Sequence, residues 1–325
     1  MTEARQRVGS TNLGHPPGDV ELSVIVSPVS DGRSISGCLD ALRAQQNPPT
    51  MKVIVPVDES IENVESLRQT YCEVDFLEVS DTAELACSND LGLAHEAIDR
   101  RRAAALHSAN TPIVALTDAQ ARPASNWCAN IVEAHRRTTH AVIGGAIENS
   151  RDRLVNWALY FCDAGRYQNP LPEGPARYVS DVNVSYKRLV LDEVADVWRQ
   201  TYNEVAVHDA IRAQGEMLWL RRDLVVYQDR GLLPLKYALK ERLAWARLYA
   251  GRRSQRVPKS KRVVLAATSP LLGGLLLWRQ TRLALQRGRH KGAFLRAFPL
   301  LLLIDLLWGV GEFIGYTSGR AAGSH

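Results

Sequence analysis

The interpretation of this chain depends on the stretch PIVALTDAQARPASNW, residues Pro112 to Trp127. Its first residues are largely apolar and predict a buried β-strand that leads to Asp118. Ala119 and Gln120 follow, at positions where a metal-binding enzyme often carries further acids. Asp118 is therefore part of a thinned metal site, part of a working site of another kind, or a residue that only caps the loop after its strand.

Similar apolar runs occur elsewhere and predict further strands at LSVIVSP (22–28), KVIVPV (52–57), DFLEVS (75–80) and AVIGG (141–145). Helices are predicted at about 34–45 and 91–109, where apolar residues recur at helical spacing. Strands that alternate with helices are typical of βαβ units, so the sequence predicts an α/β fold with a mostly parallel sheet flanked by helices. Ligands of such sheets bind beyond the carboxyl ends of the strands, where Asp58 and Asp118 are expected.

Composition and missing motifs exclude several classes of protein. The chain has 325 residues, enough for one large α/β domain and an appendage. Its five cysteines are odd in number and lack CxxC spacing, which argues against a zinc site or a disulfide framework and favours a reducing compartment. Because GxGxxG, GxxxxGK[ST] and GxSxG are all absent, Rossmann, P-loop and Ser-His-Asp hydrolase sites are not expected.

The order of motifs between Leu22 and Arg253 resembles the family-2 glycosyltransferases, which have the GT-A fold. SVIVSPVSDG resembles the first strand of that family, KVIVPVDES resembles EVIVVDDGS, and ALTDAQARPASNW stands in the place of the Asp-x-Asp segment. GGAIEN (144–149), WALYF (157–161) and VNVSYKR (182–188) resemble the acceptor half of a membrane-associated branch. The resemblance implies transfer of a sugar from a nucleotide-activated donor, with inversion at the anomeric carbon.

The resemblance also implies which residues bind the donor: Pro28, Asp58, Arg102, Asp118, Arg242 and Arg247. Asp118 would be the metal ligand and would hold Mg²⁺ or Mn²⁺ together with oxygens of the donor diphosphate, whose negative charge grows as the glycosidic bond breaks. Arg242 and Arg247 lie in KERLAWAR, which resembles a worn Gln-x-x-Arg-Trp segment. A basic amphipathic helix on an anionic surface is the other interpretation of that segment.

For catalysis the resemblance implies Glu204, at the position of the first acid of a Glu-Asp pair, as the base that takes the proton of the acceptor hydroxyl. Asp209 is the second candidate. The alternative is that Glu204 only stabilises the start of a helix through the helix dipole. Acceptor contacts are implied for Glu148, Asn149 and Asn183.

The acids that the family carries are missing at Val57, Ala119, Gln120 and Val205. A catalytically inactive protein with the GT-A fold, acting as a membrane-bound binding or scaffold subunit, is therefore the alternative to a working glycosyltransferase. It predicts weak or absent nucleotide binding.

Basic and apolar segments alternate near the C-terminus. RRSQRVPKSKR (252–262) holds six basic residues in eleven and precedes the uncharged run VVLAATSPLLGGLLLW (263–278). The basic segment 279–296 precedes the run FPLLLLIDLLWGVGEFIGY (298–316), which is apolar except for Asp305 and Glu312. The positive-inside rule disfavours translocation of the segment 279–296, so monotopic membrane attachment is favoured over a spanning hairpin. A soluble helical hairpin packed on the catalytic domain is the remaining alternative.

The sequence thus predicts a disordered tail (1–20), a GT-A glycosyltransferase domain (21–253) and basic and apolar membrane-attachment helices (254–325). The expected partners are a nucleotide-sugar donor, a lipid-linked or glycan acceptor and a membrane surface. Nucleic acid is not expected, because the basic residues flank apolar runs and lack an aromatic stacking platform. The expected location is at the membrane, with the catalytic domain facing the cytoplasm.

Overall fold

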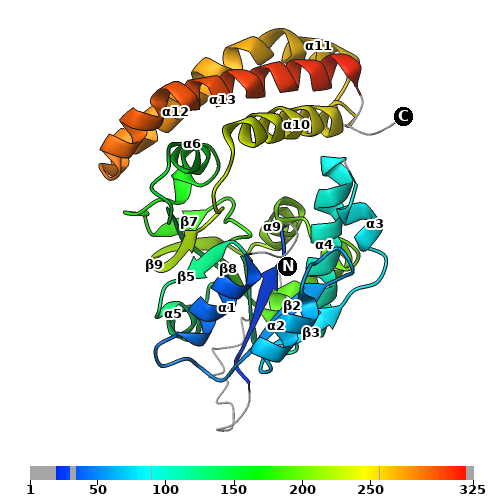
Figure 1. Cartoon of the computed structure of the whole chain (residues 1–325), viewed down its shortest axis with the longest axis vertical. Coiled ribbons are helices and arrows are strands. Elements are labelled where there is room, and N and C mark those ends of the chain that lie inside the picture. The colour runs from blue at the N-terminus through cyan, green and yellow to red at the C-terminus, as the bar shows by residue number, and fades with distance from the viewer. Residues whose placement is uncertain (1–19, 30–33, 89, 256, 320–325) are drawn as a thin grey trace, which may run out of the picture.

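The computed structural model of the chain describes residues 20–29, 34–88, 90–255 and 257–319 (Figure 1). Almost all of the predicted N-terminal tail lies outside the described residues, as do Ser30 and Asp31 of the first motif.

Four strands form the parallel half of a single sheet. β1 (Leu22–Ser27) lies between β2 (Met51–Val57) and β4 (Ile113–Asp118), β3 (Asp75–Glu78) pairs with β2, and all three pairings are parallel. Every residue of β1 and β4 is buried, as expected for strands covered on both faces. The four strands predicted in this part of the sequence are confirmed.

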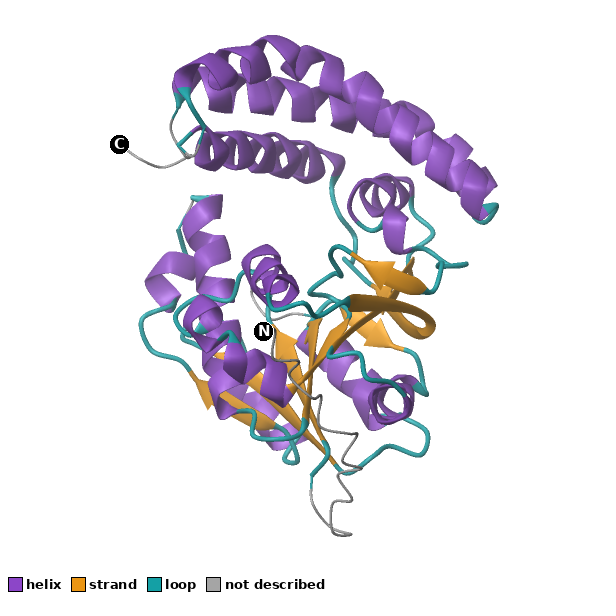
Figure 2. Cartoon of the chain, turned by 180° about the vertical axis from the view of Figure 1, so that it is seen from behind, coloured by secondary structure: helices purple, strands orange, loops and turns teal. Residues whose placement is uncertain are grey.

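The other strands make the sheet mixed rather than mostly parallel. β8 (Val184–Lys187) is antiparallel to β4 and to β6 (Val142–Asn149), whereas β9 (Leu218–Gln228) is parallel to β6. The short strands β5 (Ala121–Pro123) and β7 (Gly174–Ala176) are antiparallel to β9. The sheet curls along the order β3-β2-β1-β4-β8-β6-β9-β5 (Figure 2). The reason for the difference is that the βαβ rhythm ends after β4, and β8 enters beside β4 from the opposite direction.

Each face of the sheet has its own hydrophobic core. Leu22, Val24 and Val26 of β1 belong to the core that includes α1 (Ile35–Arg43) and α5 (Trp127–Arg137). Ile25 belongs to the core of the opposite face, which includes α4 (Leu91–Ser108), α7 (Arg188–Glu193), α8 (Ala195–Trp198) and α9 (Glu204–Ala213). The period of two along β1 therefore distributes its side chains between two helical layers. The short helix α2 (Val64–Thr70) packs against the first core through Val64 and Leu67, and α3 (Ala83–Ala86) lies against α4.

The C-terminal part of the chain forms a further helical layer (Figures 1 and 2). It consists of α10 (Leu235–Ser254), α11 (Lys259–Thr268), the 3₁₀ turn Ser269–Leu271, α12 (Leu272–Arg287) and α13 (Lys291–Ser318). α13 lies against α10, α11, α12 and α6 (Leu154–Asp163). By length and composition, the segments Lys259–Arg287 and Lys291–Ser318 are both able to cross a membrane.

Two glycines of α13 allow its close approach to α10. A Cβ atom at Gly311 would lie 2.5 Å from the Cβ of Ala246, and one at Gly315 would lie 2.6 Å from the Cβ of Ala250. No other residue leaves room for this contact without a shift of one helix. Asp305 of α13 is also buried, and it accepts a hydrogen bond from Gln280 of α12 at 3.2 Å.

Candidate active site

Asp118 is the last residue of β4 and lies at the carboxyl end of the parallel half of the sheet. Its exposure is only 4%, and its Oδ1 has no hydrogen-bond partner among the described residues. Burial and the negative charge of Asp181 raise the pKa of Asp118 to about 6, although Arg102 opposes this rise. A buried carboxylate oxygen without a partner is unfavourable, so this oxygen marks a position where a ligand would be stabilising.

Arg102 connects α4 to the ends of the strands. Its Nε donates a hydrogen bond to Ser27 Oγ at 3.1 Å, and its Nη1 lies 2.6 Å from Asp181 Oδ2 and 3.6 Å from Asp99 Oδ1. Burial lowers the pKa of Arg102, but the carboxylates of Asp181 and Asp99 raise it further, so the guanidinium stays charged. A donor phosphate at this position would compete with both carboxylates.

Glu204 is the first residue of α9 and lies beside Asp181. Its Oε2 accepts a hydrogen bond from the backbone N–H of Asp181 at 2.9 Å. Asn203 caps the helix, since its side chain accepts from the backbone N–H of Ala206. Burial and the charge of Asp181 raise the pKa of Glu204 to about 8. Glu204 therefore holds a proton near neutral pH more readily than an ordinary glutamate, as a group that exchanges protons there must.

Asp181 is a further candidate site residue, which the sequence analysis did not identify. It lies in the loop between β7 and β8. Burial raises its pKa, but Arg102, the hydrogen bond with Glu204 and His95 together lower it below its usual value. The loop has no periodic pattern, and the only signal is an acid directly before VNVSYKR. Asp181 joins Asp99, Asp118 and Glu204 around one guanidinium; these four carboxylates and Arg102 are called the Arg102 cluster below.

His95 borders the Arg102 cluster from the preceding turn of α4. Its Nε2 lies 3.6 Å from Asp99 Oδ2, and burial lowers the pKa of His95 to about 4. Burial raises the pKa of Asp99 to about 7, against the opposing charge of Arg102. Asp99 and His95 are therefore closer to neutral than their types suggest, and the positive charge in the cluster comes from Arg102.

Asp58 follows β2 and is held by the protein itself. It accepts hydrogen bonds from the backbone N–H of Ser60 at 2.9 Å and from the hydroxyls of Ser60 and Thr82, and Arg101 Nη1 lies 3.3 Å from both carboxylate oxygens. Burial raises the pKa of Asp58, but these hydroxyls and Arg101 lower it below its usual value. Arg101 also donates to the carbonyl of Pro28 at 3.3 Å. A nucleotide base would thus have to replace contacts that Asp58 already makes.

Glu148, an acceptor candidate, is 3% exposed at the end of β6. It accepts hydrogen bonds from the backbone N–H of Asn169 at 2.9 Å and from Arg289 at 3.2 Å, and His290 Nε2 lies 2.9 Å away. Arg289 and His290 form the turn between α12 and α13. Glu148 therefore attaches the helical layer to the sheet.

The two asparagine candidates differ in their surroundings. Asn183 is buried, accepts from Trp127 Nε1 at 2.9 Å and donates to the carbonyls of Ala146 and Leu224 at 2.8 and 3.0 Å. Asn183, directly before β8, thereby joins β6 and β9 to α5. Asn149 is partly exposed and donates to the carbonyl of Arg151 at 2.7 Å.

The remaining candidates make no hydrogen bond or ion pair with the Arg102 cluster within the described ranges. Arg242 pairs with Asp163 at 2.7 Å and its guanidinium lies 5.4 Å from the ring centre of Trp308. Arg247 is exposed on α10. Asp209 is exposed and accepts from the hydroxyl of Tyr178 at 3.0 Å. The structure thus brings together Arg102, Asp118 and Glu204, and leaves Arg242, Arg247 and Asp209 outside this group.

Arg230 is a second cation near Asp118 that the sequence did not indicate. It follows β9 and pairs with Glu241 at 2.8 Å and with Asp163 at 3.6 Å. Its charge acts on Asp118 and lowers the pKa of that carboxyl. Arg230 therefore links the α10 region electrostatically to the end of β4.

The side chains do not form a ready-made metal site. In the part of the chain that the structure describes, no group of three or more His, Cys, Asp or Glu residues is placed to hold a metal ion. Asp118 offers one free oxygen, but the neighbouring carboxylate of Asp181 is paired with Arg102. The protein's own ligands therefore do not fit a tightly bound Mg²⁺ or Mn²⁺.

Comparison with solved structures identifies the fold. Residues 1–349 of TarS from Staphylococcus aureus match with a TM-score of 0.50 and 13% identity, over 90% of this chain and 92% of that chain. The chain has a GT-A-like fold. The same TarS fragment in complex with UDP-GlcNAc matches with a TM-score of 0.48 and 14% identity, over 92% of each chain.

A mannosyltransferase from Pyrobaculum calidifontis, PcManGT, in complex with GDP-Man and Mn²⁺, matches with a TM-score of 0.44 and 17% identity, over 91% of this chain and 92% of that chain. No family model and no curated protein sequence matches the chain. The GT-A fold predicted from the motifs is confirmed, and the neighbours named here are glycosyltransferases.

Proposed function

We propose that this protein is a glycosyltransferase of the family-2 type, which moves a hexosyl group from a nucleotide-activated donor to a membrane-proximal, lipid- or polyprenyl-linked acceptor of a cell-envelope glycan. The observation that carries the proposal is the position of Asp118, which has a free buried oxygen at the end of β4 beside Arg102 in a GT-A-like fold. The structure of TarS with UDP-GlcNAc supports a nucleotide sugar as the donor.

In the proposed reaction, Glu204 accepts the proton of the acceptor hydroxyl while that oxygen attacks the anomeric carbon. The bond between the sugar and the diphosphate breaks, its electron pair stays on the diphosphate, and the configuration inverts. Arg102 and Arg230 supply positive charge near Asp118 for the departing nucleoside diphosphate. The pKa of Glu204, about 8, suits a base that works slightly above neutral pH.

The helical layer supports attachment to the cytoplasmic face of a membrane without crossing it. α13 lies directly on α10 through Gly311 and Gly315. α10 carries charged residues along its whole length: Lys236, Lys240, Glu241, Arg242, Arg247, Arg252 and Arg253. Because a spanning α13 would draw this charged helix toward the hydrocarbon, an in-plane arrangement is favoured.

Calorimetric titration of the detergent-purified protein tests the donor site. UDP, GDP and their sugars are titrated with and without Mn²⁺ into the wild type, Asp118→Ala and Asp192→Ala; Asp192 lies in a surface ion pair with Arg188 and is the control. We expect selective binding of one nucleotide sugar that Asp118→Ala weakens at least about tenfold and the control does not. If binding also requires Mn²⁺, the donor diphosphate completes a metal site at Asp118; if it ignores Mn²⁺, the arginines carry the charge.

Asp58 and Arg102 already make hydrogen bonds and ion pairs with other residues of the protein, so they are less available to a donor. This favours a second candidate, an inactive binding or scaffold protein. It predicts that none of these nucleotides binds, whether or not Mn²⁺ is present. That result would contradict the proposed glycosyltransferase.

A further inference from the structure

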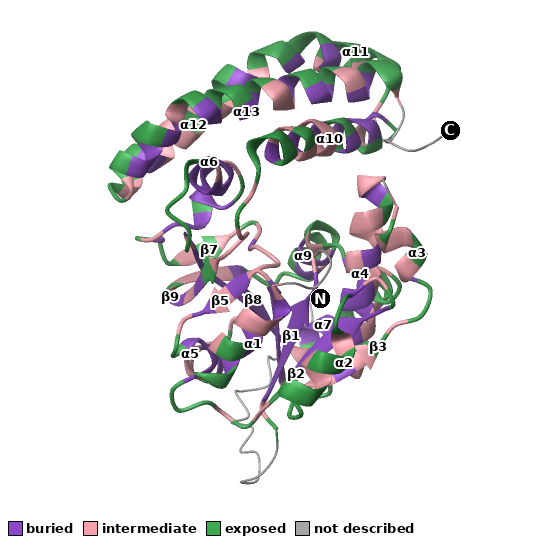
Figure 3. Cartoon of the chain, in the orientation of Figure 1, coloured by how far each residue is buried: buried purple, intermediate pink, exposed green. Residues whose placement is uncertain are grey.

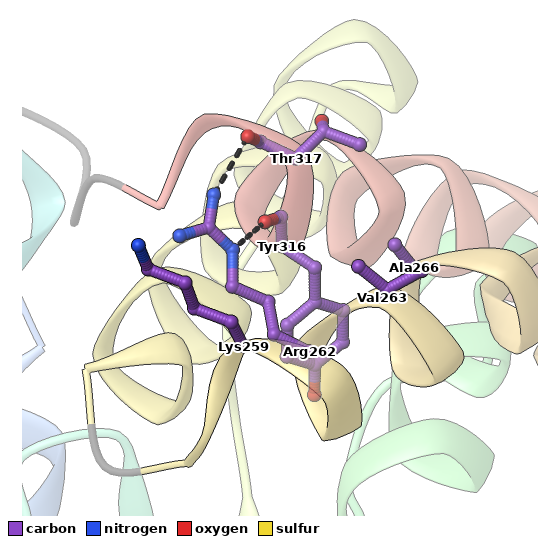
Figure 4. A pocket seen from close by; sticks show the side chains of 6 residues that line it. All are labelled: Lys259, Arg262, Val263, Ala266, Tyr316 and Thr317. Carbon is purple, nitrogen blue, oxygen red and sulfur yellow. Dashed lines mark hydrogen bonds between the residues drawn. The ribbon is translucent and has the colours of Figure 1, made fainter.

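Two hollows lie between α13 and the segment made of α11 and the following 3₁₀ turn (259–271); we call this contact the α11–α13 seam. The first, of about 440 Å³, is lined by Lys259, Arg262, Val263, Ala266, Tyr316 and Thr317 (Figure 4). The second, of about 270 Å³, is lined only by apolar residues and glycine: Pro270, Leu306, Gly309, Val310 and Phe313. From Leu306 to Thr317 the seam extends along about 17 Å of α13. One end of the seam is therefore basic and the rest is apolar.

The basic end is open to an anion. Arg262 donates through Nε to the carbonyl of Tyr316 and through Nη2 to that of Thr317 at 2.8 Å, which fixes the guanidinium in the hollow (Figure 4). Lys259 is exposed, and no acidic side chain among the described residues pairs with Lys259, Lys261 or Arg262. α11 begins at Lys259 without a side-chain cap, so its first backbone N–H groups add positive potential at the same end.

The apolar part of the seam is exposed to a degree unusual for a helix pair packed on a soluble domain. Val263 is 67% exposed, Leu271 is 73% exposed and Val310 is 49% exposed. Exposed residues recur along α11, α12 and α13 (Figure 3). Exposure of this apolar surface to water is unfavourable, whereas its burial in hydrocarbon is favourable.

We propose that the α11–α13 seam binds an anionic phospholipid of the membrane, with the lipid phosphate at Lys259 and Arg262 and an acyl chain in the apolar hollow. This inference rests on the membrane attachment in the proposed function and names the lipid class that it requires. An acidic peptide would satisfy the basic end but leave the apolar hollow empty, and a neutral lipid would do the reverse. Only an anionic amphiphile satisfies both ends.

Titration of the full-length protein in a non-ionic detergent tests the head-group end. The probes are dihexanoylphosphatidylglycerol, dihexanoylphosphatidylcholine and inorganic phosphate, and binding is followed by calorimetry. We expect the phosphatidylglycerol to bind most tightly and Lys259→Gln to weaken it about fivefold, as for loss of one basic contact at an anionic surface. Lys236→Gln, at an exposed lysine of α10, is the matched control and should leave binding unchanged.

Phe313→Gln tests the apolar end, with Leu189→Gln on the 70% exposed Leu189 of α7 as its control. We expect Phe313→Gln to weaken the short-chain phosphatidylglycerol and to leave inorganic phosphate unchanged. Equal affinity for phosphate and for the lipid would overturn the lipid assignment, and so would equal effects of Lys259→Gln and Lys236→Gln.

Co-sedimentation with vesicles separates this inference from the proposed function. Phosphatidylcholine vesicles and equimolar phosphatidylcholine–phosphatidylglycerol vesicles are compared for the same variants. Preference for the anionic vesicles that Lys259→Gln reduces supports the seam as a lipid site, even if no nucleotide binds. Equal binding to both vesicles contradicts it, while normal donor binding by Lys259→Gln shows that the active site is intact.

Discussion

The guanidinium of Arg102 lies 2.6 Å from the carboxylate of Asp181, and their side chains are only 5% and 23% exposed. Removal of one partner from a buried pair leaves the other charge uncompensated. We therefore expect Asp181→Asn to lower the free energy of unfolding by about 3 kcal/mol in urea denaturation. Asp192→Asn, which breaks the surface pair with Arg188, should cost less than about 0.5 kcal/mol. Equal losses in the two variants would mean that water screens the Arg102–Asp181 pair.

The raised pKa of Glu204 makes stability depend on pH. The ordinary pKa of a glutamate is 4.5, and the pKa of Glu204 in the folded chain is about 8. Between pH 4.5 and about pH 8, the folded chain therefore keeps a proton on Glu204 that the unfolded chain releases. The stabilisation from this proton is therefore complete below pH 4.5 and is lost as the pH rises through about 8. We expect Glu204→Gln, which has no proton to lose, to gain Tm relative to the wild type across this range. A difference in Tm that stays constant with pH would show that Glu204 titrates normally.

Glu148 should act as an attachment point between the sheet and the helical layer. Glu148→Gln weakens its contacts with Arg289 and His290, so we expect faster tryptic cleavage in the turn between α12 and α13. Glu173→Gln, at an exposed glutamate that contacts the side chain and the backbone N–H of Arg222, is the control. If both variants are cleaved at the wild-type rate, other contacts hold the turn.

Alanine should have opposite effects on stability at a glycine inside the α10–α13 contact and at a glycine with open space around it. At Gly311 a Cβ atom would lie 2.5 Å from Ala246, so Gly311→Ala should destabilise the protein by about 1–3 kcal/mol through overpacking. At Gly274 of α12 nothing lies within 4 Å of the added atom, and Gly274→Ala should stabilise by about 0.5–1 kcal/mol. Thermal unfolding measures both. Stabilisation by both substitutions would show that α13 moves away from α10 easily.

In-plane attachment predicts that the α12–α13 turn and the catalytic part lie on the same side of the membrane. A membrane-impermeant thiol reagent is applied to Gln286→Cys and Glu173→Cys in a chain whose five cysteines are serine. We expect both positions to be labelled in inverted vesicles and neither in intact cells. Labelling of Gln286→Cys from the opposite side would establish a spanning hairpin.

Local sequence patterns predicted the parallel half of the sheet because its strands are short apolar runs separated by helices. They did not predict the antiparallel entry of β8, whose partners β4 and β6 are chosen by packing between distant segments. The register shift between Gly145 and Ala146, opposite β9, likewise leaves no pattern in β6 itself. The predicted GT-A fold rested on the order of motifs and not on these pairings.

The site shows the same division. Asp118 was found because it ends a recognisable strand, whereas Asp181 lies in an irregular loop. Arg101 and Arg102 are neighbours on α4, and their directions differ by about 100° around the helix axis. Sequence alone does not fix that rotation, so it could not tell that Arg101 meets Asp58 while Arg102 meets Asp181.

The position of α10 determines how far the Arg102 cluster lies from the membrane surface, and therefore how far an acceptor must extend. α10 contacts α13 on one side and α4, which carries Arg102, on the other. α10 meets α4 near Gly92, and Arg102 lies about 15 Å further along α4, away from α10 (Figure 1). Together with two helix-packing distances of about 8–10 Å, this places the Arg102 cluster roughly 30–35 Å above the lipid if the outer face of α13 rests on the bilayer as proposed. A hydroxyl at the level of the lipid phosphates would lie too low to react. The thickness of the helical layer would then set a minimum length for the acceptor. Only acceptors with a spacer of several sugar units between the lipid and the reacting hydroxyl would reach the site.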